Sequence, residues 1–258
     1  MSGSSCAADD VFMLEPQRLR ALLPALRDAW NASPVFRHVV SDGFLPEHSA
    51  QLLSEYFPAH DHSIWLDWKK RHRSQYGKQG VGDSSRFPLL DWHLRHALYE
   101  FNSSQFVEFV EGVTSIRKLI PDPYYSGGGV HQILPGGILD IHTDFNYYER
   151  LNLYRRVNVI IYLTLRWEEP YGGCLEFWDN APRRGGKCFT SIAPLFNRMV
   201  IFETDKTSFH GHPREWRGPE GIYRRSIALY YYTVDKVADK QYDGRTDFQG
   251  YVTKDLPS

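Results

Sequence analysis

Two histidines and one aspartate form the most informative pattern in this chain. One residue separates His142 from Asp144, and His210 stands far downstream in the sequence. In an extended strand, residues i and i+2 point to the same face, so the first two side chains project together. Two histidines and a carboxylate on one side of Fe(II) leave its remaining positions open for oxygen chemistry. The pattern predicts such a site if His210 arrives from a strand adjacent in space. The alternative is that His142 and Asp144 belong to an exposed polar loop.

The surrounding sequence supplies the strands that such a site needs. The turn at Pro135-Gly136-Gly137 leads into an alternating strand that carries His142 and Asp144. Further short segments rich in β-branched and aromatic residues are bounded by glycine and proline turns. They are Val157–Thr164, Cys174–Trp178, Arg198–Phe202 and Arg224–Thr233. This arrangement predicts a closed or sandwiched β core, such as a jelly roll, with flanking helices, in the α+β class.

From His131 to Thr233 the chain resembles the iron(II)- and 2-oxoglutarate-dependent dioxygenases, in particular their prolyl-4-hydroxylase-like branch. The matching segments are "PGGILDIHTDFN", "RRVNVIIYLTLRWEEPYGGCLEFWD", "NRMVIFETDKTSFHGH" and "YRRSIALYYYT". The resemblance implies a double-stranded β-helix, with His142, Asp144 and His210 as iron ligands that form the catalytic centre. It also implies Fe(II), 2-oxoglutarate and O2 as cofactor and co-substrates, and suggests ascorbate as an accessory. His212 could also reach a metal, but the family places its ligand at His210, so His212 is interpreted as a residue behind the ligands or at the rim.

The last strand carries the expected 2-oxoglutarate site. Arg224, Ser226 and Ala228 share one face, where a charge is followed by two small residues that leave room for a dicarboxylate. The planar guanidinium of Arg224 suits bidentate contact with the distal carboxylate, and Arg225 is the alternative. The resemblance implies that Tyr162 assists this arginine.

Two further residues are expected to line the pocket, namely Gln132 and Asn158. Prolyl hydroxylases often have a tyrosine near Leu134, and its absence leaves the type of substrate open.

The chain is expected to form one domain. Residues 1–10 are expected to be disordered, 11–120 to form a mostly helical support, 121–235 to form the β core, and 236–258 to be a C-terminal extension. Helical periodicity predicts amphipathic helices that cover the outer face of the core. They are Pro16–Trp30, Leu45–Phe57 and Trp92–Val113, the last with a break near Asn102–Ser104.

Composition limits the classes of partner. With 258 residues and a net charge of −1, nothing indicates a polyanion partner, and the basic run Trp68–Arg73 is interpreted as a solvated loop rather than a nucleic-acid site. Three cysteines without paired spacing suit a reducing cytosol. No signal peptide or membrane span is expected, because charges interrupt Val11–Trp30.

Three functions remain open at this point. The first is hydroxylation of an unactivated C–H bond in a small molecule, such as an amino acid or a biosynthetic intermediate, with release of succinate and CO2. The second is the same reaction on a prolyl or other residue of a protein, and the third is a non-catalytic cupin-like binding module. Because the chain shows no partner-binding domain, the small molecule is favoured. The sequence specifies neither the substrate nor an oligomeric state.

Overall fold

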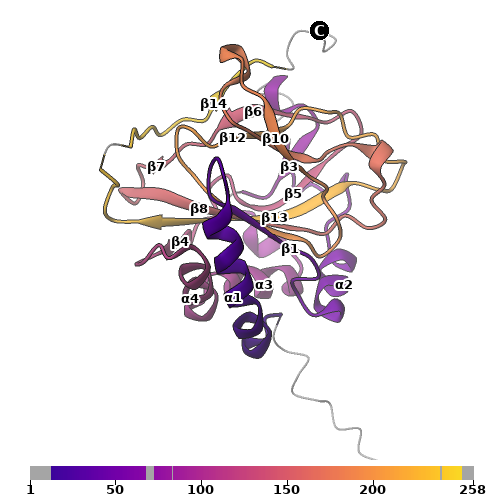
Figure 1. The fold of residues 1–258 in the computed structure, drawn as a ribbon. Coiled ribbons are helices and arrows are strands. Elements are labelled where there is room, and N and C mark those ends of the chain that lie inside the picture. Colours follow the sequence, from indigo (N-terminus) through magenta and orange to yellow (C-terminus); the bar gives the residue numbers. More distant parts are fainter. Residues whose placement is uncertain (1–12, 68–72, 83, 239, 252–258) are drawn as a thin grey trace, which may run out of the picture.

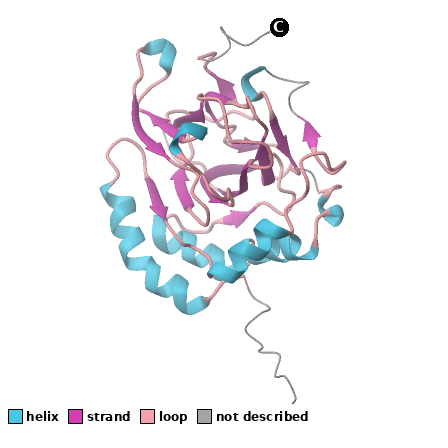
Figure 2. Cartoon of the chain, turned by 90° about the vertical axis from the view of Figure 1, so that its right-hand side faces the viewer, coloured by secondary structure: helices cyan, strands magenta, loops and turns pink. Residues whose placement is uncertain are grey.

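The structure is a computed structural model that describes residues 13–67, 73–82, 84–238 and 240–251. The segment expected to be disordered, Cys6 and all but the last residue of the basic run lie outside these ranges. Figure 1 shows helices below a large sheet and a second sheet above it, and Figure 2 shows the same layers after a quarter turn.

Four α-helices make the lower layer. They are α1 (Pro16–Ala32), α2 (Glu47–Glu55), α3 (Trp92–Phe101) and α4 (Ser104–Thr114). Short 3-10 turns are η3 (Arg73–Gln75), η4 (Phe87–Leu89), η5 (Glu169–Tyr171) and η6 (Pro182–Arg184). The expected helices are confirmed, including the break between α3 and α4. The chain restarts there because the Ser103 hydroxyl accepts a hydrogen bond from the backbone N–H of Phe106, at 3.4 Å, and so caps the new helix.

The major sheet has the strand order β1-β11-β8-β13-β5-β3-β2, with β4 added beside β13 and β7 beside β8. Its strands are β1 (His38–Ser41), β2 (Leu66–Asp67), β3 (Lys78–Gly80), β4 (Ile120–Pro121), β5 (Gly129–Ile133), β7 (Tyr147–Tyr148), β8 (Leu153–Tyr162), β11 (Met199–Glu203) and β13 (Arg224–Thr233). The minor sheet has the order β10-β9-β12-β6-β14. Its strands are β6 (Leu139–Thr143), β9 (Leu175–Trp178), β10 (Cys188–Ile192), β12 (Phe209–His212) and β14 (Asp247–Phe248).

The central strands β8 and β13 separate two environments. Side chains on one face, such as Val159 and Ile227, pack with α3 and α4 in the main apolar core. Alternation turns their neighbours, such as Asn158 and Ser226, to the cavity between the sheets. The expected mainly β architecture with helical support is therefore present, and it is a jelly-roll core.

Strands outside the expected core complete both sheets. β1, β2 and β3 come from residues 11–120, where a mostly helical support was expected, and β14 comes from residues 236–258. Because strands from both regions extend the sheets, we propose that the described chain is a single domain. Within that part of the chain, no helix is long and apolar enough to span a membrane.

Candidate metal centre and its cavity

The minor sheet brings the three predicted ligands together. His142 on β6 and His210 on β12 are directly opposite each other in the antiparallel pair, and Asp144 follows β6 immediately. One ligand atom from each residue lies within 4.8 Å of the others. The three residues are only 4 to 8% exposed. The register thus brings His210 from a distant segment to the strand of His142, as the sequence pattern requires, and the exposed-loop alternative is wrong.

Backbone carbonyls orient both imidazoles. The Nδ1 atom of His142 lies 2.8 Å from the carbonyl oxygen of Asp140, and the Nδ1 atom of His210 lies 2.8 Å from that of Ser208. A carbonyl can only accept, so each Nδ1 carries a proton and Nε2 is the ring nitrogen left to face the metal position. The Nε2 atoms lie 3.5 and 3.4 Å from the oxygens of Asp144. Burial, followed by the charge of His210, lowers the pKa of His142, which favours the neutral form that binds metals.

Two buried side chains hold Asp144. Its Oδ2 accepts from Arg155 Nη2 at 3.0 Å and from Asn158 Nδ2 at 2.7 Å, while Arg155 Nε donates to Asn158 Oδ1 at 2.7 Å. Burial would raise the pKa of Asp144, but the charge of Arg155 and the neighbouring imidazoles hold it well below 3.8. The guanidinium of Arg155 also stacks 3.4 Å from the centre of the Tyr230 ring. The carboxylate is therefore ionised and fixed in place, as a metal ligand must be.

The other end of the cavity is built around Arg224. Its Nε donates to the carbonyl of Gly173 at 2.6 Å, and its Nη2 donates to the Tyr162 hydroxyl at 3.2 Å. Ser226 and Ala228 extend the same face of β13 along the cavity. Burial, partly offset by the charge of Arg224, raises the pKa of Tyr162, so its hydroxyl keeps its proton and can donate to a ligand. This end suits a carboxylate of a dicarboxylic acid whose other end reaches the metal.

The structure brings most of the predicted residues together, and Tyr162 does not line the cavity itself but bonds to Arg224, which does. Asn158 reaches the cavity, but Gln132 does not: its amide donates to Gln79 at 2.7 Å on the other face of β5, and His131 and Ile133 line the cavity instead. His212 also lines the cavity and is only 1% exposed, so the rim position considered for it is wrong. Burial, followed by the charge of Arg224, holds the pKa of His212 well below 6.5.

Sequence reasoning missed several cavity residues, namely Lys78, His131, Arg155 and Tyr230. The available signal for Arg155 was the pair Arg155 and Arg156 in a largely apolar strand, because a buried guanidinium needs a charged partner. Lys78 gave no signal, since β3 is short and distant from the motif.

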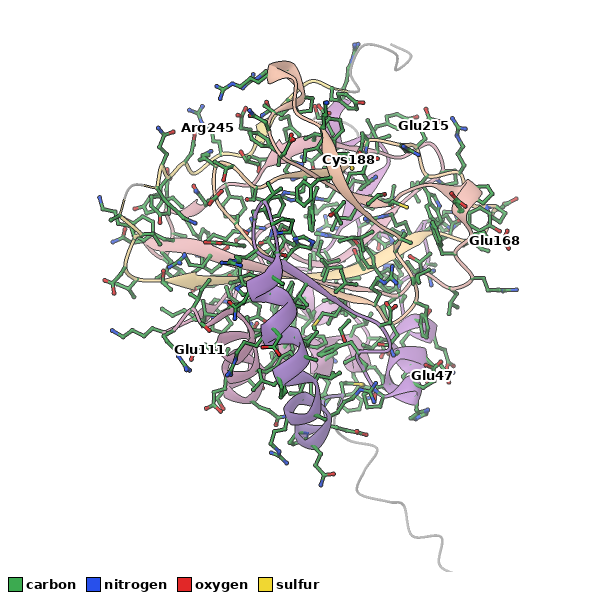
Figure 3. All side chains as sticks on the ribbon, in the orientation of Figure 1. Glu47, Glu111, Glu168, Cys188, Glu215 and Arg245 are labelled. Carbon is green, nitrogen blue, oxygen red and sulfur yellow. The ribbon has the colours of Figure 1, made fainter. Side chains whose placement is uncertain are left out.

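A second, outer cavity opens on the metal centre. It has about 210 Å3 of space, whereas the inner cavity has about 80 Å3. The two cavities share Lys78, Leu139, His142, Asp144 and Tyr230. The lining of the outer cavity is completed by Gln75, Gly127, Phe145, Thr246 and Phe248. Exposed charged residues such as Glu47, Glu168, Glu215 and Arg245 lie at the periphery of the molecule and line neither of these two cavities (Figure 3). The two cavities provide adjacent places for a co-substrate and a substrate.

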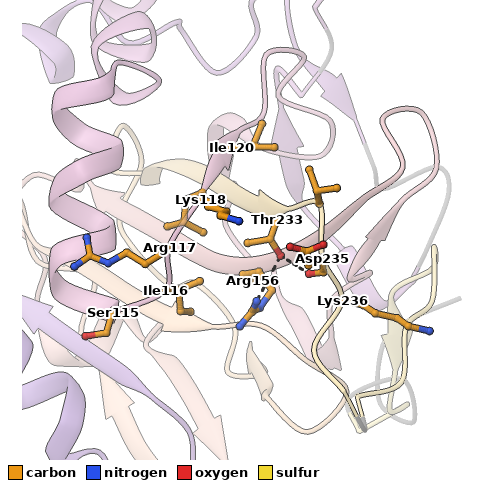
Figure 4. Close-up of a pocket in the computed structure, with 11 residues that line it drawn as sticks. Ser115, Ile116, Arg117, Lys118, Ile120, Arg156, Thr233, Asp235 and Lys236 are labelled. Atoms are coloured by element: carbon orange, nitrogen blue, oxygen red, sulfur yellow. Dashed lines mark hydrogen bonds between the residues drawn. The ribbon is translucent and has the colours of Figure 1, made fainter.

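A larger surface hollow of about 550 Å3 lies elsewhere, beyond the end of α4 (Figure 4). Its lining includes Arg117, Lys118, Arg156 and Lys236, and the Arg156 guanidinium donates to the Thr233 hydroxyl at 3.4 Å. None of the lining residues belongs to the metal centre or to the Arg224 end of the inner cavity. The hollow is therefore separate from the candidate site.

Comparison with known proteins shows which family this part of the chain resembles. Residues 128–232 match the family model described as the 2OG-Fe(II) oxygenase superfamily. The chain carries a 2OG-Fe(II) oxygenase domain. Enzymes of this superfamily are dioxygenases that use Fe(II), 2-oxoglutarate and O2, and the His142, Asp144 and His210 cluster of this oxygenase fits iron. No curated protein matches the sequence.

Solved structures share the fold of the oxygenase at low identity. A Trichoplax adhaerens prolyl hydroxylase, solved with a hypoxia inducible factor peptide, has a TM-score of 0.55 and 17% identity, over 84% of this chain and 91% of that one. A Pseudomonas putida prolyl-4-hydroxylase has a TM-score of 0.55 and 15% identity, over 82% and 99%. HygX from Streptomyces hygroscopicus, solved with nickel, 2-oxoglutarate and hygromycin B, has a TM-score of 0.50 and 13% identity, over 91% and 97%.

Proposed function

We propose that this dioxygenase hydroxylates an unactivated C–H bond of a small molecule, such as an amino acid or a biosynthetic intermediate, and releases succinate and CO2. In this proposal His142, Asp144 and His210 hold the iron, while Arg224, Tyr162 and Ser226 bind 2-oxoglutarate. The observation that carries the proposal is the placement of three oriented ligand atoms and a buried arginine along one cavity.

Each protein group has a distinct task in this arrangement. The bound iron and 2-oxoglutarate supply the oxidising chemistry. The carbonyls that fix the two imidazoles, together with Arg155 and Asn158 on the carboxylate, pre-set the ligand geometry before the metal arrives. Arg224 and Tyr162 fix the distal carboxylate, so that the other end of 2-oxoglutarate is directed to the metal. The buried walls limit the access of water to the reacting atoms.

The pairing of β14 with β6 favours a small substrate over an extended peptide. β14 pairs with β6, Asp247 with Thr143 and Phe248 with His142, so the chain itself occupies the edge of the minor sheet beside the metal ligands. An extended peptide therefore could not add to that edge as a further strand. Among similar folds, one was solved with a peptide and another with hygromycin B, so the fold alone does not choose between the two kinds of substrate.

Anaerobic titration with Fe(II) and then 2-oxoglutarate tests the cofactor part of the proposal. The measured signal is the weak visible charge-transfer band of the iron chelate. We expect the band in the wild type, its loss in Asp144→Ala, and a much weaker 2-oxoglutarate affinity in Arg224→Ala.

Two surface changes provide matched controls. Asp235→Ala and Arg217→Ala remove the same residue types at exposed positions and are expected to leave the band unchanged. A folded, iron-replete wild type without the band would contradict the proposal and favour a binding module. Substrate kind is then tested by 2-oxoglutarate turnover with free amino acids against prolyl peptides, and stimulation by peptides alone would contradict the small-molecule assignment.

A further inference from the structure

Lys78 is a cation of the cavity that the roles assigned to Arg155 and Arg224 leave without a partner. It belongs to β3, in which it pairs with Ile133 of β5, and Ile133 pairs in turn with Arg224 of β13. The three residues therefore form one row across neighbouring strands and point to the same face, and all three line the inner cavity. Two strand spacings, about 10 Å, separate the backbones of Lys78 and Arg224.

The two cations point to different parts of the site. Arg224 bonds to Gly173 and to Tyr162, on the side of the cavity away from β3. Lys78 instead lines the outer cavity as well, where Arg224 is absent from the lining. Lys78 lines the outer cavity together with His142 and Asp144, which places the lysine beside the metal centre.

Lys78 has no counterion bonded to its ammonium among the residues that the structure describes. Its ammonium makes no hydrogen bond or ion pair within the described part of the chain. The other two cavity cations are accounted for, since Arg155 pairs with Asp144 and Arg224 is assigned to the distal carboxylate of 2-oxoglutarate. A half-buried cation without a partner is unfavourable, and such groups are retained where a ligand supplies the opposite charge.

We propose that Lys78 binds a carboxylate of the substrate, so that the substrate is a small carboxylic acid held in the outer cavity beside the metal. This inference rests on the proposed function, whose substrate class it narrows. A single ammonium suits a monoanion, and the neutral side chains of Gln75 and Thr246 in the same cavity can supply additional hydrogen bonds. His142 and Asp144 line this cavity as well, so a molecule anchored there presents its carbon atoms to the metal centre.

Trifluoroacetate can serve as the probe, because its fluorine signal broadens when it binds near a paramagnetic ion. The protein is loaded with Co(II) and saturating 2-oxoglutarate, and loading is first verified from the visible spectrum. We expect saturable broadening in the wild type, and an affinity at least about tenfold weaker in Lys78→Met, as for loss of a charged hydrogen-bond partner. Lys78→Arg should retain binding, and neutral trifluoroethanol should not bind.

The controls separate this inference from the proposed function. Lys187→Met removes an exposed lysine and should leave trifluoroacetate binding unchanged. Failure to load Co(II) or 2-oxoglutarate would count against the proposed function itself. With loading established, equal broadening in wild type and Lys78→Met, or none in the wild type, would overturn the role of Lys78. A parallel loss of 2-oxoglutarate affinity in Lys78→Met would also overturn it, because Lys78 would then bind the co-substrate.

Discussion

Replacing Lys78 with methionine should stabilise the metal-free protein. Burial is the largest cause that lowers the pKa of Lys78, and the charges of Arg155 and Arg224 lower it further, while Asp144 opposes them. The result is a pKa of about 8 instead of 10.5. Methionine keeps most of the unbranched apolar stem of lysine and removes the ammonium, so the packing is largely retained and the unfavourable charge is lost.

The size and sign of the effect follow from this pKa. Lowering it from 10.5 to about 8 corresponds to about 3 kcal/mol, at 1.36 kcal/mol per pKa unit. Above pH 10.5 the lysine is neutral in both states, so the charge has no effect on stability. As the pH falls towards 8, the unfolded chain binds a proton that the folded chain does not, and wild-type stability decreases. Below pH 8 the full penalty remains.

Chemical denaturation between pH 7 and 11, with a chelator present, measures this difference. The free energy of unfolding of Lys78→Met should exceed that of the wild type by about 3 kcal/mol at pH 7, and the excess should disappear as the pH rises from 8 to 10.5. Lys187→Met, at an exposed position, should show no such trend. A difference that does not vary between pH 8 and 10.5 would refute the buried-cation interpretation.

Three other changes test the supports of the site. Arg155→Met leaves the metal-site carboxylate buried without its cation, so we expect Fe(II) affinity to fall about 10- to 100-fold and the free energy of unfolding by about 3–5 kcal/mol; unchanged affinity in a metal titration would contradict this. Gly173→Ala puts a methyl group 3.0 Å from Arg224 Cδ on a backbone with φ of +69°, so 2-oxoglutarate binding should weaken about tenfold or more while metal binding persists. The same anaerobic titration measures both, and equal weakening of the two would argue against a local effect. Burial raises the pKa of Asp205, but the 2.8 Å bond from Lys240 and other hydrogen bonds bring it below 3.8. The stability that this pairing adds, about 1 kcal/mol, is therefore present above pH 3.8 and lost as the pH falls through the lower, folded pKa. Urea denaturation of Lys240→Met at pH 6 should show this loss, and a deficit that does not shrink as the pH is lowered through the folded pKa of Asp205 would contradict it.

The sequence was sufficient wherever the pattern alternates clearly. On β13, Arg224, Ser226 and Ala228 share the cavity face as predicted, because a strand with one apolar and one polar face has a fixed parity. The same alternation predicted that His142 and Asp144 project together, whereas the choice of His210 rested on the family resemblance. The sequence did not show in this way which residues of β5 face the cavity. All five of its residues are buried, so hydrophobicity does not distinguish the face of Gln132 from that of His131.

The residues that the sequence did not reveal share a different property. Lys78 comes from a three-residue strand whose place in the sheet depends on pairing with a segment far along the chain. Short strands have weak local signals, and their position is fixed by tertiary contacts that periodicity does not encode. Arg155 was hidden because its role appears only when Asp144 is brought beside it from a separate segment.

Unlike the other missed cavity residues, Lys78 lies outside the part of the chain that matches the superfamily. The metal cluster, Arg224 and Tyr162 all lie within residues 128–232, the part that matches the superfamily. Much of the outer cavity comes from outside it, with Lys78 from the N-terminal side and Phe248 from β14. Chemistry common to many enzymes requires a fixed set of groups, whereas the substrate is recognised by whatever surrounds them. We therefore expect the elements that extend both sheets beyond the shared core to determine which substrate this oxygenase accepts.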